Sequence, residues 1–315
     1  WGIEYLLWLV KEAIAKNILP EESFWKQSSA WPSTERVSAC IWSALLRVID
    51  FDPEKTEEIK EWVSYLAKKL VEWQRENGWW WYNKKYFWDA DSTARTIEFL
   101  EALQQSDYID NDIQAIIQES IEKWVVFIKT HQKDDGWFTT YNPEAISLLE
   151  KKYENASWRW ESHICVTSTV VKILQSIQDN LWIDDKDTIQ RAKEYLEKEV
   201  IKREHPHGVN AYWRKTILYV LHEIARIMPD YYKERIQRIA QEWDTMSDSV
   251  ELGLFLHVLV NAKHEDWKTV QRLINLQEDD WGFQASSELL VPRPDVGHEE
   301  LHELQYHTKT MSDTD

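Results

Sequence analysis

The chain has 315 residues, of which 55 are acidic and 37 are basic, so its net charge is −18. This charge repels phosphate backbones, and we therefore expect no nucleic-acid partner. Hydrophobic residues make up 43% of the chain and charged residues 29%, values that argue against wholesale disorder and against a membrane span.

The counts of cysteine and glycine exclude further classes of protein. The two cysteines, Cys40 and Cys165, match no zinc-ligand spacing and supply no disulfide framework, so a reducing cytoplasm is the expected compartment. There are only seven glycines, and neither Gly-x-Gly-x-x-Gly nor the P-loop pattern occurs. Nucleotide binding by those two routes is therefore excluded.

Apolar residues recur at helical spacing nearly throughout, and no segment reads convincingly as a strand. In chain order, amphipathic helices are predicted over 3–14, 59–73 and 113–128. A second set of helices is predicted over 33–48, 91–103, 162–177, 210–227 and 247–260. Short polar residues are candidate N-caps for several of these second helices: Ser33, Asp89 or Asp91, and Asn210.

A turn with the pattern Gln-x-x-x-Gly-Trp repeats between the two sets of helices. It occurs at 74–79 and 132–137, and at 277–283 with Trp and Gly exchanged; more eroded copies lie at 27–31 and 205–213. Gly permits the backbone conformation that ends a helix, Gln can hydrogen-bond to exposed backbone groups, and Trp can pack on the next outer helix. The pattern predicts a repeat of helical hairpins.

Five or six such hairpins can close into a double-layered α/α barrel in which the second helix of each pair faces the axis. The predicted fold class is therefore all-α, with one barrel domain over residues 1–294. Residues 141–157 are an expected loop insertion, and residues 295–315 form a polar C-terminal tail.

These turns resemble the QW repeats of squalene-hopene cyclases and other class II terpene cyclases, a superfamily that includes protein prenyltransferase β subunits. The resemblance runs from Lys26 to Phe283. The segment 88–94, Trp-Asp-Ala-Asp-Ser-Thr-Ala, is similar to the Asp-x-Asp-Asp-Thr-Ala acid motif of that family, with Ser92 in place of the last Asp. The resemblance implies that Asp91 protonates a linear isoprenoid, such as farnesyl diphosphate, and that Asp89 tunes it.

The chemistry gives an independent reason for a pair of acids. Protonating an alkene requires a carboxylic acid that keeps its proton at neutral pH, and two crowded carboxyl groups in an apolar pocket can share one proton. Asp89 and Asp91 have the spacing for such a dyad. The alternative is that both are helix-start acids favoured by the helix dipole.

Other site residues follow from the same resemblance. Thr169 occupies the position at which squalene-hopene cyclases carry a histidine that supports the acid, and His163 nearby is the candidate replacement. Aromatic rings stabilise carbocations, and arginines can bind a diphosphate. Tryptophans in loops or inner helices are the candidate pocket walls: Trp31, Trp42, Trp88, Trp158, Trp160 and Trp213. Arginines near the starts of inner helices are the candidate diphosphate ligands: Arg36, Arg95, Arg159 and Arg214.

The expected reaction needs no cofactor, because protonation starts it; Mg²⁺ would enter only with a diphosphate substrate. No Asp-Asp-x-x-Asp metal motif is present. The expected partner is a small isoprenoid, with peripheral membrane contact compatible with it and no transmembrane segment.

Three other functions remain open at this point. The barrel can serve as a binding scaffold without catalysis. A zinc-dependent prenyltransferase-like subunit is suggested by His163-Ile164-Cys165, although Asp91 stands where its thiolate ligand is expected. A zinc peptidase is suggested by His298-Glu-Glu-Leu-His302, a His-Glu-x-x-His match in the polar tail.

Overall fold

A computed structural model of the chain describes residues 11, 46, 49, 53–80, 90–141, 164–181, 185–203, 211–242, 249–261, 263 and 267–276. In the helical residues 91, 92, 201–203, 211–216, 240–242 and 249–251, it describes the backbone alone. The regular structure of this part of the chain is helical, apart from one isolated bridge between Gln132 and Phe138. The predicted all-α fold class is confirmed.

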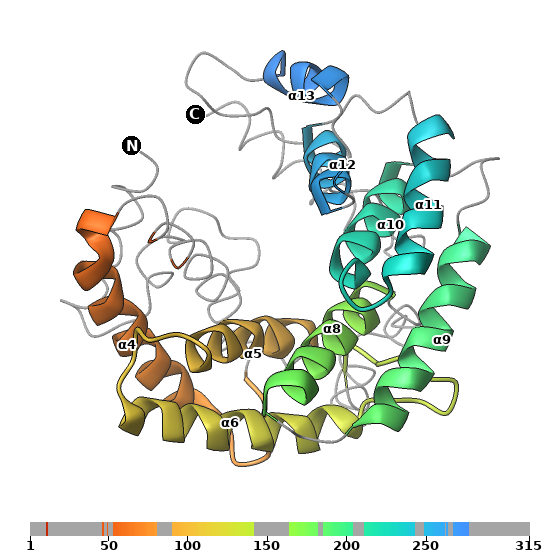
Figure 1. The fold of residues 1–315 in the computed structure, drawn as a ribbon. Coiled ribbons are helices and arrows are strands. Elements are labelled where there is room, and N and C mark those ends of the chain that lie inside the picture. Colours follow the sequence, from red (N-terminus) through yellow and green to blue (C-terminus); the bar gives the residue numbers. More distant parts are fainter. Residues whose placement is uncertain are drawn as a thin grey trace, which may run out of the picture. The chain divides into compact units, whose positions relative to one another are not determined.

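The helices follow one another as Figure 1 shows. Their bounds are η1 Pro53–Lys55, α4 Thr56–Trp73, α5 Ala90–Gln104, α6 Asn111–Lys129, α8 Ile164–Leu181, α9 Lys186–Arg203, α10 Ala211–Ile224, α11 Pro229–Glu242, α12 Ser249–Asn261 and α13 Trp267–Ile274. The predicted helices over 59–73, 91–103, 113–128, 162–177, 210–227 and 247–260 are thereby confirmed to within a few residues. Those over 3–14 and 33–48 lie outside the described helices.

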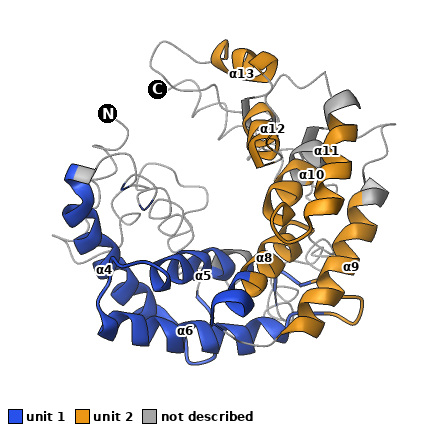
Figure 2. Cartoon of the chain, in the orientation of Figure 1, with its two compact units in different colours: residues 1–132, 138–152, 176–184 blue, residues 133–137, 153–175, 185–315 orange. Residues whose placement is uncertain are grey.

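The chain divides into two compact units (Figure 2). Unit 1 comprises residues 1–132, 138–152 and 176–184; unit 2 comprises residues 133–137, 153–175 and 185–315. Residues of each unit make most of their contacts within that unit. The extent of the predicted barrel domain, 1–294, stays a prediction.

In unit 1, α4 packs on α6, and α5 packs on both. One face of α4 is buried, and it is formed by the apolar residues Ile59, Trp62, Val63, Leu66, Ala67 and Leu70. Helix α6 begins after Asp110, whose carboxylate accepts a 2.9 Å hydrogen bond from the backbone N–H of Ile113 and so caps the helix. A repeat of three to four residues between apolar positions thus produces the buried face that the sequence predicted.

In unit 2, α10 is the central helix, in contact with α9, α11 and α12. In Figure 1, α8, α10 and α12 follow one another in one layer, and α9 and α11 form a second layer beside it. The phenol of Tyr232 on α11 donates to the carbonyl of Val258 on α12. Two local layers are what the hairpin repeat predicts; closure into a barrel stays a prediction.

Among the residues described, no helix combines the length and the apolar character that crossing a membrane requires.

Candidate functional site

The first Gln-x-x-x-Gly-Trp turn is held by its own glutamine and glycine. The Gln74 side chain donates to the carbonyl of Gly78 at 3.1 Å and to that of Ser120, on α6, at 2.9 Å. Gly78 has φ +93°, and a Cβ built there would lie 2.3 Å from the carbonyl oxygen of Lys123 on α6. Only glycine fits this position, because it needs both a positive φ and close backbone approach.

The second copy of the turn repeats this geometry in unit 2. Gly136 has φ +99°, and a Cβ there would lie 2.2 Å from the carbonyl oxygen of Arg191 on α9. The backbone bonds also correspond: Lys133 N–H to the Trp137 carbonyl at 2.9 Å, against Arg75 N–H to the Trp79 carbonyl at 3.0 Å. The sequence repeat is therefore a structural repeat in which each glycine packs on the next outer helix.

The first turn also fixes the start of α5, where the acidic motif lies. Trp80 is fully buried, and its indole N–H donates to the Leu70 carbonyl at 2.7 Å. The hydroxyl of Thr93, on α5, accepts from the Trp80 backbone N–H at 3.3 Å. At the first residue of α5, the Ala90 N–H donates to the Thr140 carbonyl at 2.8 Å. The first turn of α5 is therefore bonded both to the chain before it and to the chain after the second Gln-x-x-x-Gly-Trp turn.

Asp91 is the second residue of α5, since the helix begins at Ala90. It is therefore not the N-cap residue, one of the two alternatives that the sequence left open. Asp89, the other alternative, lies outside the described residues, and the side chains of Asp91 and Ser92 do too. Their neighbours Ala90, Thr93 and Ala94 are fully buried, so this end of α5 is packed into unit 1.

The position of Asp91 can be compared with that of other helix-start acids. Besides α5, four of the described helices have an acid as their second residue, and all four are the first helices of their pairs: Glu57 of α4, Asp112 of α6, Asp187 of α9 and Asp230 of α11. The helices that correspond to α5, namely α8 and α10, have no acid in the first turn. The helix-dipole explanation thus accounts for the first helices. Among the second helices, α5 has Asp91 and α12 has Glu251 in the first turn, whereas α8 and α10 have no acid there.

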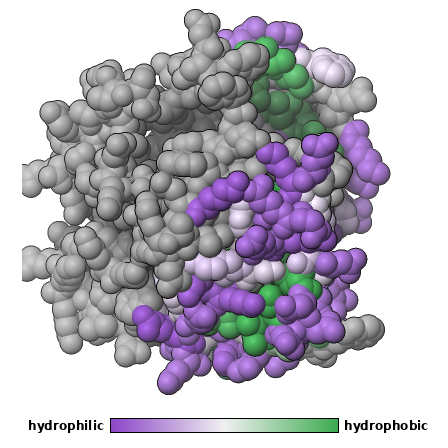
Figure 3. All heavy atoms as spheres, turned by 90° about the vertical axis from the view of Figure 1, so that its left-hand side faces the viewer, coloured by the Kyte–Doolittle hydropathy of each residue, from purple (hydrophilic) through white to green (hydrophobic). Residues whose placement is uncertain are grey.

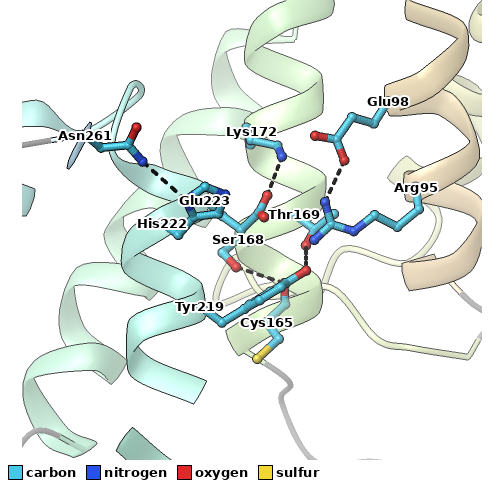
Figure 4. A network of polar contacts seen from close by, with 10 residues as sticks. All are labelled: Arg95, Glu98, Cys165, Ser168, Thr169, Lys172, Tyr219, His222, Glu223 and Asn261. Carbon is cyan, nitrogen blue, oxygen red and sulfur yellow. Dashed lines mark hydrogen bonds and ion pairs between the residues drawn. The ribbon is translucent and has the colours of Figure 1, made fainter. Parts of the chain in front are cut away.

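The described charged residues of α5 that follow Asp91 most closely in the sequence, Arg95 and Glu98, form an ion pair. Arg95 lies one helical turn after Asp91, and its guanidinium is 2.6 Å from the Glu98 carboxylate (Figure 4). Only 12% of the Arg95 side chain is exposed. Because Glu98 offsets this positive charge, Arg95 is held by its own helix rather than presented alone to a diphosphate.

A polar network in unit 2 joins α8 to α10 (Figure 4). The hydroxyl of Thr169 lies 2.9 Å from that of Tyr219. One turn further along both helices, the Lys172 ammonium lies 2.5 Å from the Glu223 carboxylate, whose side chain is only 2% exposed. The ammonium group offsets the cost of burying this carboxylate.

Polar groups continue on both sides of this network. On α8, Ser168 donates to the carbonyl of Cys165 at 2.8 Å. On α10, His222 lies 3.2 Å from Asn261 of α12 (Figure 4). The His222 ring also contacts the His257 ring edge-on, with the ring centroids 5.3 Å apart. Thr169 was predicted from the sequence as a site position, whereas Tyr219, Lys172 and Glu223 were not predicted. Their three- and four-residue spacing on predicted inner helices is the signal that could have identified them.

The remaining predicted site residues lie outside the described residues or have only their backbone described. They are Trp31, Trp42, Trp88, Trp158, Trp160, Trp213, Arg36, Arg159, Arg214 and His163. The His-Glu-x-x-His segment at 298–302 also falls outside. In the part of the chain that the structure describes, no three His, Cys, Asp or Glu side chains are grouped closely enough to hold a metal ion.

No family model matches the sequence, and no curated protein is similar to it. A solved structure of a protein from Actinoplanes is similar, with a TM-score of 0.55 over 80% of this chain and 74% of that chain. The two sequences are 18% identical, so the similarity concerns the fold alone.

Proposed function

We propose that this protein is a class II terpene cyclase, in which Asp91 is the general acid that protonates a linear isoprenoid. The observation that carries the proposal is the acid at the second position of α5. It occurs where the corresponding helices α8 and α10 have none, directly after a Gln-x-x-x-Gly-Trp turn. The hydrogen bonds of Ala90 and Thr93 support it further, because they hold the backbone of the motif in one conformation.

The proposed reaction is an isomerisation. The O–H bond of Asp91 breaks, and the π electrons of a terminal alkene form a new C–H bond, which leaves a carbocation on the neighbouring carbon. A second double bond attacks that carbon and closes a ring. A base then removes a proton from the final cation, and Asp91 regains its own proton from solvent. Any diphosphate stays attached, so no cofactor takes part in the proposal except Mg²⁺ as its counterion.

The helix start sets a condition on this mechanism. The N-terminal end of a helix favours the ionised form of an acid, whereas the reaction needs the protonated form. Asp89 and an apolar surrounding are proposed to outweigh that effect, as expected for two carboxyl groups that share one proton.

The test is the turnover of farnesyl and geranylgeranyl diphosphate by the wild type, by Asp91→Asn and by Asp112→Asn. Asp112 is a matched control because it is the exposed second residue of α6. We expect Asp91→Asn to lower turnover by at least about a hundredfold, the lower end of the range for general acid catalysis, and Asp112→Asn to leave it unchanged.

Two results would count against the proposal. Full activity of Asp91→Asn would remove Asp91 as the acid. Absence of turnover in both the wild type and the variants, with binding of the isoprenoid retained, would favour the non-catalytic binding scaffold.

A further inference from the structure

Three polar side chains meet at the ends of two helices of unit 2, α10 and α12, which pack on each other. Helix α12 is otherwise apolar: after Glu251, its only polar side chains are His257 and Asn261. In Figure 3, apolar surface is visible near the top of the molecule, at the height of α12 and α13 in Figure 1. His257 and Asn261 are four residues apart, so they share one face of the helix, and both contact His222 of α10.

The separation of the two imidazole rings fits a shared metal ion. The centroids of the His222 and His257 rings are 5.3 Å apart, and the angle between the ring planes is 82°. Two imidazole rings that bind one tetrahedral Zn²⁺ through nitrogen, with Zn–N bonds of about 2.1 Å, have their centroids about 5 Å apart. His222 is half-buried and His257 is exposed, so an ion can reach the pair from solvent, and His257 has room to turn a ring nitrogen toward it.

Asn261 lies where the supporting partner of a metal-binding histidine is expected. Its side-chain nitrogen is 3.2 Å from Nδ1 of His222 (Figure 4). A histidine that binds a metal ion through one ring nitrogen usually donates the N–H of the other to an oxygen atom. When the Asn261 amide turns over, its oxygen accepts the Nδ1–H of His222, and Nε2 of His222 is left to bind the ion.

The ends of the two helices favour a cation at this place. His222 is in the last turn of α10, which ends at Ile224, and Asn261 is the last residue of α12. The C-terminal end of a helix carries a partial negative charge, because its last carbonyl groups have no partner within the helix. Two such ends close together attract a positive ion rather than an anion.

We propose that His222 and His257 bind a divalent transition-metal ion of the Zn²⁺ class, with Asn261 holding the His222 ring in the required orientation. Imidazole is a ligand that suits Zn²⁺, whereas Mg²⁺ and Ca²⁺ prefer oxygen ligands. In the described part of the chain no group of three potential ligands is present, so water molecules complete the coordination of this two-histidine site. The bound ion joins α10 to α12 and stabilises the folded protein, because it binds the folded chain in preference to the unfolded one.

Calorimetric titration of the metal-free protein with ZnCl₂ tests the inference. The segment 298–302 contains a second pair of histidines, His298 and His302. The titration is therefore made with the variant His298→Ala/His302→Ala, which removes that competing pair. We expect this variant to bind one Zn²⁺ and its midpoint of thermal unfolding to rise on binding. MgCl₂ should neither bind at this site nor raise the midpoint.

Three further substitutions are made in the same variant. His257→Gln should abolish both the Zn²⁺ binding and the rise in the unfolding midpoint, and it should fold normally because His257 is exposed. Asn261→Ala should weaken Zn²⁺ binding about tenfold or more, as expected when the partner of a metal-binding histidine is removed. Val260→Ala is the matched control: Val260 is 71% exposed on the same helix but offers no ligand atom, so Zn²⁺ binding should be unchanged.

Three outcomes would overturn the inference: no Zn²⁺ binding by His298→Ala/His302→Ala, undiminished binding after His257→Gln, or an equal loss of binding after Val260→Ala and His257→Gln. The inference does not depend on the proposed catalysis. Asp91→Asn should bind Zn²⁺ as the wild type does, whether or not it turns over an isoprenoid.

Discussion

Gly78 and Gly253 show how differently two glycines of one chain are used. Gly78 has a positive φ and sits against the backbone of α6, whereas Gly253 lies within α12 and has nothing within 4 Å of an added Cβ. We expect Gly78→Ala to destabilise the protein by about 2 to 4 kcal/mol, because it combines backbone strain with overpacking. Gly253→Ala should stabilise it by about 0.5 to 1 kcal/mol, because alanine is the better helix former.

Urea unfolding of both variants measures these changes. A loss of less than about 1 kcal/mol in Gly78→Ala would mean that the turn can relax, and that the glycine of the repeat is a preference rather than a requirement. Gly253→Ala serves as the internal reference, since the same change in chemistry is expected to have the opposite sign.

Single residues were the least predictable part of the candidate site. The motif at 88–94 identified Asp91 from its neighbours in sequence, and the structure adds that it is the second residue of α5. Tyr219 and Glu223 escaped prediction because a polar residue on an amphipathic helix is normally taken to face water. Their partners, Thr169 and Lys172, lie 50 and 51 residues earlier in the chain. A local sequence pattern cannot predict a contact between residues so far apart.

At the scale of elements, the Lys172–Glu223 ion pair connects α8 to α10. Lys172→Met would leave the buried Glu223 carboxylate without its ammonium partner, and we expect a loss of about 3 kcal/mol or more. The double variant Lys172→Met/Glu223→Leu should recover most of that loss, because an apolar pair of similar size carries no buried charge. Thermal and urea unfolding of the two variants measure the difference.

The double variant shows whether the ion pair or the packing of the two side chains stabilises the contact between α8 and α10. If it is as unstable as Lys172→Met alone, packing of the original side chains, rather than the ion pair, is what stabilises the contact.

Tyr232 provides a pH-dependent contact between α11 and α12. Burial raises the pKa of Tyr232 above its ordinary value, so the folded protein keeps the phenol protonated where the unfolded chain ionises it. This contribution to the free energy of unfolding is complete below about pH 10, the ordinary tyrosine value, and is lost as the pH rises above it. Tyr232→Phe should therefore unfold with a shallower decline in stability above pH 10 than the wild type, measured by urea unfolding across that range.

An unchanged slope in Tyr232→Phe would assign the alkaline loss of stability to other groups. The variant should also be less stable near neutral pH, because it loses the hydrogen bond to the Val258 carbonyl.

Helix positions were predictable where the apolar repeat is strong. α4, α5, α6, α8, α10 and α12 match predicted ranges, because buried apolar residues recur at helical spacing in each of them. α9 and α11 were given no range, since Lys, Arg and Glu make up much of both helices and dilute the apolar period. A helix that is rich in charged residues and buries only one side has a weaker apolar periodicity in its sequence than a more apolar helix has.

At the scale of the whole molecule, the all-α class followed from sequence, whereas the division into two units did not. One of its boundaries falls between Gln132 and Lys133, inside the second Gln-x-x-x-Gly-Trp turn, and another falls between Gln175 and Ser176, inside α8. The sequence presents each of these segments as one piece. The fold is shared with the protein from Actinoplanes at 18% identity. A shared fold at such low identity is expected when the architecture depends on a few positions of each repeat.

The glycine contacts of the two turns have a consequence for how such a chain can evolve. At Gly78 and Gly136 a hydrogen atom rather than a side chain faces the neighbouring carbonyl, so the pitch of the repeat is set by main chain against main chain. Residues elsewhere in each hairpin are then free to be exchanged without altering that spacing. New chemistry can therefore be introduced into one hairpin while the register of the others is preserved.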